Sequence, residues 1–308
     1  MKPIKIVFFG TPAIALRSLE YLYNSDKIEV LGVVTQPDKP AGRGHKLTMS
    51  PIKEFALSKG LPVFQPKSIR KEPEIQDELK KLQPDFFVTF AFGQILSQEV
   101  LDIPKYHTIN LHASLLPRYR GANPIQRAII NGDKQTGICT MITELGLDCG
   151  DVCLKKVIDI PENMTCVDLF EEISKDSPVL IEDTLTGLLD GSVTPVKQSE
   201  NGICMANKLT KEETLIDWNK PAEDIHNLVR GIYKFPCAYF IHDGKIIKVM
   251  ETKVVRSPKK HGACGEFCDV SKNGIEIACA DCNILLVKVK PEGKGEMFAR
   301  DWYNGLKK

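Results

Sequence analysis

Residues 4–12 read Ile4-Lys5-Ile6-Val7-Phe8-Phe9-Gly10-Thr11-Pro12, an apolar run that breaks at a glycine and a proline. Because its apolar residues are consecutive rather than alternating, the run predicts a strand that is buried on both faces. Gly10 permits a tight turn, and Pro12 suits the start of a helix whose apolar spacing continues to residue 23. A buried strand followed directly by a helix is typical of an α/β fold.

The alternation of strand and helix patterns continues outward from this run. We predict further strands at residues 27–35, 61–64, 85–92, 107–112 and 137–143, and helices at residues 51–59, 73–82 and 124–130. Since most of these strands are continuous apolar runs, the fold class should be α/β, with an open, mostly parallel sheet flanked by helices. In such sheets the functional site lies at the carboxyl ends of the strands.

The rest of the chain has a different organisation. Apolar spacing predicts an amphipathic helix pair at residues 165–190, and residues 191–207 have the composition of a linker. Beyond a further helix, short alternating segments separated by Gly, Asn and Pro predict a small β-barrel of the OB type. We therefore expect a catalytic domain at residues 1–190 and a β-barrel domain at residues 208–308.

The composition is that of an ordinary folded protein. Of its 308 residues, 43% are hydrophobic and 26% are charged, which argues against intrinsic disorder. No apolar run approaches the roughly 18 residues that a membrane-spanning helix needs, and we interpret residues 4–9 as a strand rather than a signal peptide. Ten cysteines without an export signal indicate reduced thiols. We expect a cytoplasmic protein that does not bind membranes.

The turn after the first strand argues against a nucleotide cofactor. Gly10-Thr11-Pro12-Ala13 is not a G-x-G-x-x-G motif, and the sequence has no G-x-x-x-x-G-K-[ST] loop. These motifs are the usual devices that place a pyrophosphate at a helix N-terminus. A nicotinamide or ATP cofactor is therefore disfavoured.

Three polar residues follow predicted strands. Asn110 and His112 are two residues apart in one strand, so their side chains point to the same face. An amide supplies a neutral hydrogen-bond donor, and an imidazole exchanges protons near pH 7. Asp148 lies between glycines after another strand, where its carboxylate could orient a histidine ring. Taken alone, these stretches are also compatible with a structural histidine and a hairpin turn.

Together the two stretches resemble the Asn–His–Asp site of the folate-dependent formyltransferases. The family's H-x-S-L-L-P loop is similar to His112-Ala113-Ser114-Leu115-Leu116-Pro117, and its L-D-x-G-D segment is similar to Leu147-Asp148-Cys149-Gly150-Asp151. Further similar motifs occur at residues 35–44, 120–126, 206–209, 216–218 and 291–294, so the resemblance covers nearly the whole chain.

The sequence departs from the family pattern at three positions near these motifs. Ala113 stands where glycine is usual, Tyr119 where tryptophan is common, and Cys149 where threonine is common. Ala113 adds a methyl group beside the histidine, and Cys149 weakens hydrogen bonding. None of the three departures replaces a candidate catalytic residue.

The resemblance implies a formyltransferase fold and transfer of a formyl group from 10-formyltetrahydrofolate to an amine. Asn110 would stabilise the oxyanion, and His112 would assist it as a donor and proton shuttle. Asp148 would pair with His112 and, directly or through a water, take the amine proton. No metal or cysteine nucleophile is required, because the formyl group moves directly between nitrogens. The implied folate-binding residues are Ser114, Leu115, Leu116, Pro117, Phe90, Gly93 and Ile95.

Within the family, the outlying motifs resemble those of members that formylate the methionine of initiator tRNA. By this resemblance, the loop at residues 36–46 inserts at the tRNA acceptor end, and its cationic or titratable side chains are Lys39, Arg43, His45 and Lys46. Arginine holds phosphates and stacks on bases. We expect a monomer whose partners are folate and initiator methionyl-tRNA. The alternatives are a family member acting on a small amine, such as glycinamide ribonucleotide or an amino sugar, and a non-catalytic RNA-binding protein.

Four cysteines in the C-terminal third have a spacing similar to that of a zinc ribbon. They form the pattern C-x3-C-x10-C-x2-C at Cys264, Cys268, Cys279 and Cys282. The surrounding residues predict a β-hairpin, and residues four apart in a strand are separated by about 13 Å. Two sulfur ligands of one zinc ion each lie about 2.3 Å from the metal, so the two cysteines must be much closer together than about 13 Å. We therefore expect no bound metal, and the alternative is that a tight turn at Cys264–Cys268 brings the cysteines together to hold zinc.

The near-neutral net charge of +1 conceals an uneven distribution. Residues 1–204 carry 23 Lys and Arg against 26 Asp and Glu, whereas residues 205–308 carry 18 against 14. The C-terminal part is therefore the more cationic one and, with the loop at residues 36–46, is where RNA phosphates would be met. So modest an excess predicts few phosphate contacts and salt-sensitive binding.

Overall fold

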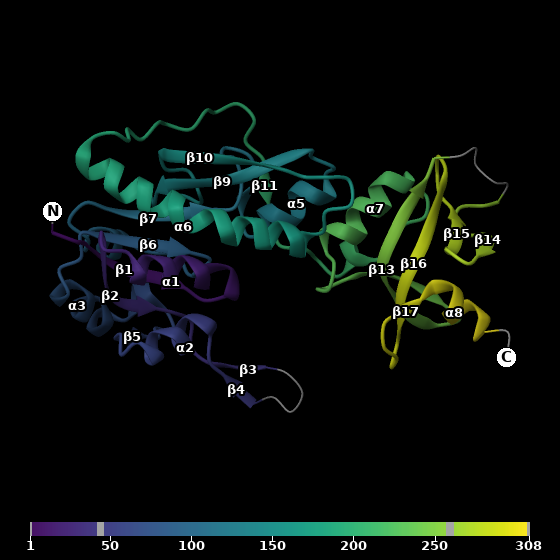
Figure 1. Ribbon diagram of the computed structural model, residues 1–308, viewed down its shortest axis with the longest axis horizontal. Helices are drawn as coiled ribbons and strands as arrows, with labels where there is room; N and C mark the ends of the chain where they lie inside the picture. The colour runs from purple at the N-terminus through teal and green to yellow at the C-terminus, as the bar shows by residue number, and fades with distance from the viewer. Residues whose placement is uncertain (1, 42–45, 257–261, 307–308) are drawn as a thin grey trace. The chain divides into compact units, whose positions relative to one another are not determined.

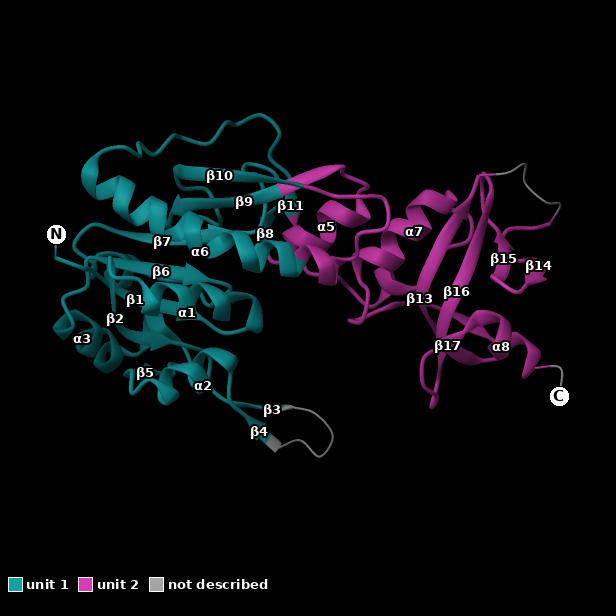
Figure 2. Ribbon diagram, viewed as in Figure 1, with its two compact units in different colours: residues 1–121, 137–158, 170–205 teal, residues 122–136, 159–169, 206–308 magenta. Residues whose placement is uncertain are grey.

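The structure is a computed structural model that describes residues 2–41, 46–256 and 262–306. Its chain forms two compact units (Figure 2). Unit 1 contains residues 1–121, 137–158 and 170–205, and unit 2 contains residues 122–136, 159–169 and 206–308. The units therefore interleave along the chain. The reason is that two short stretches from the first half of the sequence pack with the C-terminal elements.

Unit 1 is built on a seven-stranded sheet (Figure 1). Its strands are β1 (Ile4–Gly10), β2 (Ile28–Val34), β5 (Val63–Phe64), β6 (Phe86–Phe90), β7 (His107–His112), β9 (Gln135–Ile142) and β10 (Val152–Asp159). Their order is β10-β9-β7-β6-β1-β2-β5. The strands from β5 to β7 are parallel, and β9 runs antiparallel to β7. The predicted open, mostly parallel sheet is confirmed.

The opening strand β1 lies between β2 and β6 and is buried on both faces. Val7 and Phe9 pack in a core cluster with Ile69 and Leu79 on one side. Phe8 points to the opposite side and is also fully buried. The continuous apolar pattern of this segment is therefore explained by helices on both faces of the sheet.

The helical elements of this layer pack around the sheet. They are η1 (Ala13–Ala15), α1 (Leu16–Asn24), α2 (Pro51–Ser58), η2 (Ile69–Lys71), α3 (Pro73–Lys81), α4 (Gln98–Leu101) and α6 (Cys166–Asp190). Figure 1 shows α1 and α6 side by side, and an ion pair between Arg17 and Glu171 joins them. No helix among the described residues is both long and apolar enough to cross a membrane.

The predicted helix pair at residues 165–190 is instead the single helix α6. Pro178 lies inside it, where a proline removes one backbone hydrogen bond. Leu169 and Ile173 before the proline and Ile181 and Leu185 after it are all fully buried. Because the same apolar stripe continues past the proline, packing holds the two halves as one helix.

Unit 2 contains an antiparallel sheet. Its strands are β12 (Ala238–His242), β13 (Lys245–Val255), β14 (Phe267–Ser271), β15 (Gly274–Ala278), β16 (Asn283–Pro291) and β17 (Met297–Phe298). Their order is β12-β13-β16-β15-β14, with β17 beside β16. The predicted antiparallel β domain is confirmed. Within the part of the chain that the structure describes, no pairing joins β12 to β14, so the sheet is open at these strands.

Helices cover the core of this sheet. They are α5 (Pro124–Ile130), η3 (Glu212–Thr214), α7 (Ala222–Gly231) and α8 (Ala299–Asn304). Ile225 and Val229 of α7 and Trp302 of α8 belong to the same buried cluster as Ile247 and Leu286 of the sheet. The sheet therefore buries one apolar face against helices, as half-buried antiparallel sheets commonly do.

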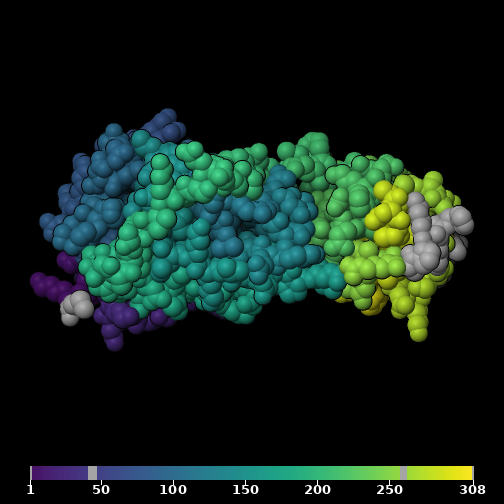
Figure 3. All heavy atoms as spheres, turned by 90° about the horizontal axis from the view of Figure 1, so that it is seen from above, coloured from purple at the N-terminus to yellow at the C-terminus, as the bar shows by residue number. Residues whose placement is uncertain are grey.

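Two small sheets complete the fold. One pairs β3 (Lys39–Ala41) with β4 (Lys46–Thr48), and the other pairs β8 (Arg120–Gly121) with β11 (Met205–Ala206). Between α6 and β11 the chain runs as an exposed segment over the face seen in Figure 3. Val196 pairs with Val152 in an isolated bridge, and Gln198 is the buried residue of this segment.

Candidate active site

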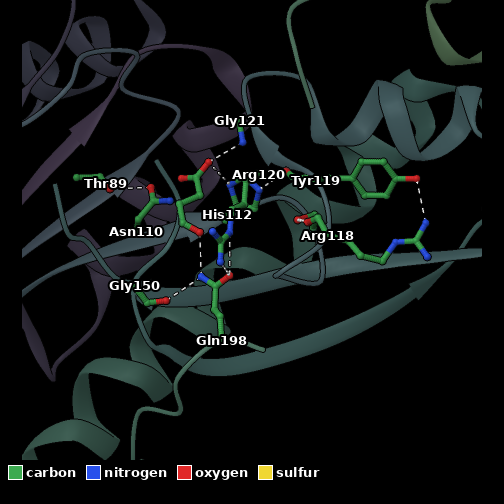
Figure 4. Close-up of polar contacts among 11 residues, drawn as sticks. Thr89, Asn110, His112, Arg118, Tyr119, Arg120, Gly121, Gly150 and Gln198 are labelled. Atoms are coloured by element: carbon green, nitrogen blue, oxygen red, sulfur yellow. Dashed lines mark hydrogen bonds and ion pairs between the residues drawn. The ribbon is translucent and has the colours of Figure 1, made fainter. Parts of the chain in front are cut away.

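Asn110 projects from β7 next to Thr89 of the neighbouring strand β6. The two residues are paired in register, and the Thr89 hydroxyl donates a 2.7 Å hydrogen bond to Oδ1 of Asn110 (Figure 4). This bond fixes which end of the amide is oxygen. Among the described residues the Nδ2 group of Asn110 has no acceptor, so it is available to donate to a ligand.

His112 lies two residues further along β7 and is buried. Its Nε2 atom is 2.8 Å from the carbonyl oxygen of Tyr119. Since a carbonyl only accepts, Nε2 must carry the hydrogen and donate it. The other ring nitrogen, Nδ1, faces Oδ2 of Asp148 at 3.6 Å. Any proton that His112 exchanges therefore moves at Nδ1.

Asp148 occupies a tight turn after β9, where its φ of 47° lies in the left-handed region. Its Oδ2 atom accepts a 2.7 Å hydrogen bond from the backbone amide of Gly121 (Figure 4). Its other carboxylate oxygen, Oδ1, has no hydrogen-bond partner among the described residues. The three predicted catalytic residues are thus brought together, with a carboxylate oxygen available to accept a proton.

Two cysteines, Cys139 and Cys149, lie near these residues, and neither has the environment of a reactive nucleophile. Cys139 of β9 lies opposite His112 in the strand register and is fully buried. Burial raises the pKa of the Cys139 thiol to about 12, so the thiol stays protonated and unreactive at neutral pH. The Cys149 thiol lies 3.8 Å from Oε2 of Glu144 and donates to this carboxylate.

The residues predicted to bind folate are scattered between core and surface. Phe90, Ser114 and Leu116 are almost fully buried, and the Ser114 hydroxyl donates to the carbonyl of Arg118 at 2.6 Å. Ile95, in contrast, is 66% exposed. The remaining predicted residues, Leu115, Pro117 and Gly93, are accessible to solvent. No contact that the structure describes tests these seven assignments, and they stay predictions.

A pocket of about 440 Å³ opens between the start of β7 and the end of β9. Thr108 and Thr143 line it, and the hydroxyl oxygens of both are buried without a hydrogen-bond partner in the described residues. Both oxygen atoms lie behind the pocket surface, so the unpaired hydroxyls do not themselves identify a ligand. Glu144 and Gly146 also line the pocket, which therefore adjoins the turn that carries Asp148.

The predicted tRNA loop is described only in part. Lys39 is exposed in β3, Arg43 and His45 lie outside the described residues, and of Lys46 only the backbone in β4 is described. The base of the loop is held by Lys53, whose ammonium group donates at 2.7 Å to both Asp38 and Gln65. The hydrogen bond from Lys53 holds the pKa of Asp38 below its ordinary value.

The predicted C-terminal hairpin is present as β14 and β15. Among the described residues, no cluster of three or more His, Cys, Asp or Glu side chains could hold a metal ion. All ten cysteines are free thiols.

The comparisons with known proteins agree with this arrangement. A family model described as formyl transferase matches residues 4–185, and a model of the formyl transferase C-terminal domain matches residues 208–307. The chain belongs to the formyl transferase family. A methionyl-tRNA formyltransferase of Clostridium novyi (strain NT) is 43% identical over 302 residues, covering 98% of this chain and 97% of that protein.

Solved formyl transferase structures share the fold. The sugar 3N-formyl transferase WlaRD has a TM-score of 0.66 at 20% identity, covering 95% of this chain and 99% of that one. HypX from Aquifex aeolicus in complex with tetrahydrofolic acid has a TM-score of 0.65 at 16% identity. The match covers 98% of this chain and 47% of the HypX chain, which is about half of its length.

Two residues that contact the predicted site escape sequence reasoning. Thr89 is a polar residue inside a predicted apolar strand, a signal that marks it as unusual but does not name its partner. Gln198 lies in the predicted linker, yet Figure 4 shows its amide between Arg120 and the backbone of Gly150. Since the segment has no regular periodicity, no sequence pattern predicts that it reaches the site.

Proposed function

We propose that this chain transfers the formyl group of 10-formyltetrahydrofolate to the amino group of methionine on initiator tRNA. The observation that carries the proposal is the grouping of an oriented, unsatisfied amide at Asn110 with the paired side chains of His112 and Asp148. These groups match the needs of a formyl transfer between two nitrogens, which are an oxyanion donor and a proton acceptor. The 43% identity to a methionyl-tRNA formyltransferase over nearly the whole chain supports the choice of acceptor.

Asn110 supplies the donor for the formyl oxygen. As an amine attacks the formyl carbon, negative charge develops on that oxygen and favours any hydrogen-bond donor placed against it. The Nδ2 group of Asn110 is fixed for this task before substrate binds, because Thr89 holds the opposite end of the amide. A donor that is already oriented costs no reorganisation during the reaction.

Asp148 and His112 handle the proton. The attacking amine must lose a proton, and Oδ1 of Asp148, or a water that it holds, is the acceptor. The ring of His112 exchanges its proton at Nδ1, because the carbonyl of Tyr119 holds Nε2. The Asp148 carboxylate orients the ring, which then serves to donate a proton to the folate nitrogen that leaves.

The folate is bound by the pocket beside the Asp148 turn. The polar residues Gln98, Asp102 and Glu144 line it and suit the polar edge of a pterin ring, and its volume of about 440 Å³ lies in the usual range for small-molecule sites. His107 also lines this pocket, and burial lowers its pKa, so its ring is neutral at physiological pH. The predicted folate-binding residues at 114–117 complete the site on the His112 side.

Two surfaces are assigned to the tRNA. One is the loop between β3 and β4, and within its described residues the exposed Lys39 carries a positive charge. The other is a row on the outer face of the unit 2 sheet, where Lys248 lies opposite both Lys290 and Tyr239. Two lysines beside an aromatic ring suit a phosphate backbone with an adjacent base. We expect a monomeric cytoplasmic enzyme.

The test is formylation of charged initiator tRNA by the purified chain. With 10-formyltetrahydrofolate present, mass spectrometry should detect formyl-methionine released from the tRNA, and an Asn110→Ala variant should form far less. Uncharged tRNA and unformylated tetrahydrofolate serve as controls. Formylation of glycinamide ribonucleotide or of an amino sugar nucleotide, with none of methionyl-tRNA, would assign the chain to a small amine instead and overturn the proposal.

A further inference from the structure

Gln198 is the buried residue of an otherwise exposed segment. Its side chain is 9% exposed, whereas its neighbours Lys197 and Ser199 face solvent. Two residues earlier, Val196 exchanges both backbone hydrogen bonds with Val152 at 2.8 and 2.9 Å. This bridge anchors the segment to the start of β10 and directs Gln198 inward.

The amide of Gln198 uses its full hydrogen-bonding capacity. Its Oε1 atom accepts from Nη2 and Nε of Arg120 at 2.8 and 3.2 Å. Its Nε2 group donates to the carbonyl oxygens of Asp148 and Gly150 at 2.9 and 2.8 Å (Figure 4). Because a guanidinium only donates and a carbonyl only accepts, this orientation of the amide is the one that satisfies every partner.

Asp148 needs such support because its backbone is strained. A φ of 47° is unfavourable for a residue with a side chain and persists only where the surroundings enforce it. Gln198 holds the carbonyl of Asp148, and the amide of Gly121 holds its carboxylate. Arg120 directly precedes Gly121, so a single network fixes both ends of Asp148 relative to the same short strand, β8.

We propose that Gln198 is a positioning residue of the formyl transfer, acting through Asp148. It holds the strained turn so that the Asp148 carboxylate faces Nδ1 of His112 and leaves Oδ1 open to the amine. Gln198 touches neither His112 nor the pocket lining, so its effect on turnover passes through Asp148. The inference rests on the proposed function and extends it to a residue in the segment after α6.

The first test compares Gln198→Leu and Gln198→Glu with Lys197→Ala as the matched control. Leucine removes all four hydrogen bonds, and glutamate keeps an acceptor for Arg120 but turns a carboxylate oxygen toward two carbonyls. Both substitutions should lower kcat by about 10- to 100-fold, since small misplacements of catalytic groups cost about that much. The KM for folate and for tRNA should stay within about twofold. Variants that keep wild-type kcat would overturn the proposal.

The second test asks whether Gln198 acts through Asp148 or merely supports the fold. In an Asp148→Asn background, measured under single turnover, Gln198→Leu should lower the rate by less than about twofold, because the group that it positions is already impaired. Equal losses in the two backgrounds would identify a general structural role and contradict the inference.

The third test needs no substrate and separates this inference from the proposed function. The backbone amide of Gly121 donates to the Asp148 carboxylate, so its hydrogen exchange, followed by NMR, reports whether the turn is held. Gln198→Leu should speed exchange at Gly121 several-fold, whereas Lys197→Ala should leave it unchanged. Unchanged exchange at Gly121 in Gln198→Leu would refute the positioning role. Faster exchange in a chain that does not formylate methionyl-tRNA would count against the proposed function alone.

Discussion

Thr89 and Asn110 lie opposite each other in the parallel strands β6 and β7, and the Thr89 hydroxyl donates to Oδ1 of Asn110 at 2.7 Å. Neither residue is close to the other in the sequence. The register of two buried strands brings them together and sets the direction of the Asn110 amide. The orientation of the Asn110 amide is therefore set by the sheet, and the oxyanion role proposed for Asn110 can be tested at both residues.

Replacement of Asn110 by alanine removes the proposed donor to the formyl oxygen. We expect kcat to fall on the order of 100- to 1000-fold, as for other oxyanion donors. Binding of initiator tRNA, measured by filter retention at fixed salt, should change little, because the substitution removes no positive charge. Turnover within a few-fold of the wild type would remove Asn110 from the mechanism.

Replacement of Thr89 by valine keeps the volume but releases the Asn110 amide. Since the amide then has to be oriented during the reaction, we expect kcat to fall roughly 10-fold with unchanged KM. Thr136→Val is a suitable control, because the Thr136 hydroxyl is buried and has no partner in the described residues. Equal kinetic effects of the two substitutions would speak against a role for the Thr89 hydrogen bond.

Lys53 ties the base of the loop between β3 and β4. Its substitution by methionine breaks the bonds to Asp38 and Gln65 and should loosen this loop. We expect KM for methionyl-tRNA to rise several-fold, with the KM for folate unchanged. Lys67→Met, at an exposed lysine outside this network, is the control. A change confined to the folate KM would show that the loop does not serve the tRNA.

The stability of unit 2 should depend on pH through His226. The ring is 3% exposed, donates to the carbonyl of Glu162 and accepts from Thr252. Burial lowers its pKa, and the nearby Arg230 charge lowers it further, while Glu223 and Glu162 oppose the shift. The unfolded chain therefore takes up a proton near pH 6.5 that the folded chain resists. Stability is complete above that pH and is lost as the pH falls toward the folded-state pKa.

Thermal unfolding of the wild type and His226→Gln measures this contribution. Between pH 7.5 and pH 5, the unfolding temperature of the wild type should fall further than that of the variant, because glutamine takes up no proton. Parallel decreases in both proteins would assign the acid sensitivity to other groups.

The sequence by itself determined the class of the fold and named the candidate residues of the site. Consecutive apolar residues such as Val7, Phe8 and Phe9 need cover on both faces, and this local requirement predicts a strand inside a parallel sheet. Asn110 and His112 share a face because strand geometry repeats every two residues. These features depend on residues that are neighbours in the sequence, so they can be predicted from the sequence alone.

Tertiary structure alone decided which groups meet. Strand register brings Thr89 into contact with Asn110, and the path of an irregular segment brings Gln198 into contact with Asp148. No local sequence period encodes either contact. The same reason explains α6, where packing of a continuous apolar stripe outweighs the break expected at Pro178. Local pattern predicts the candidate catalytic residues, whereas long-range packing sets the orientation of their side chains, because orientation depends on partners distant in the chain.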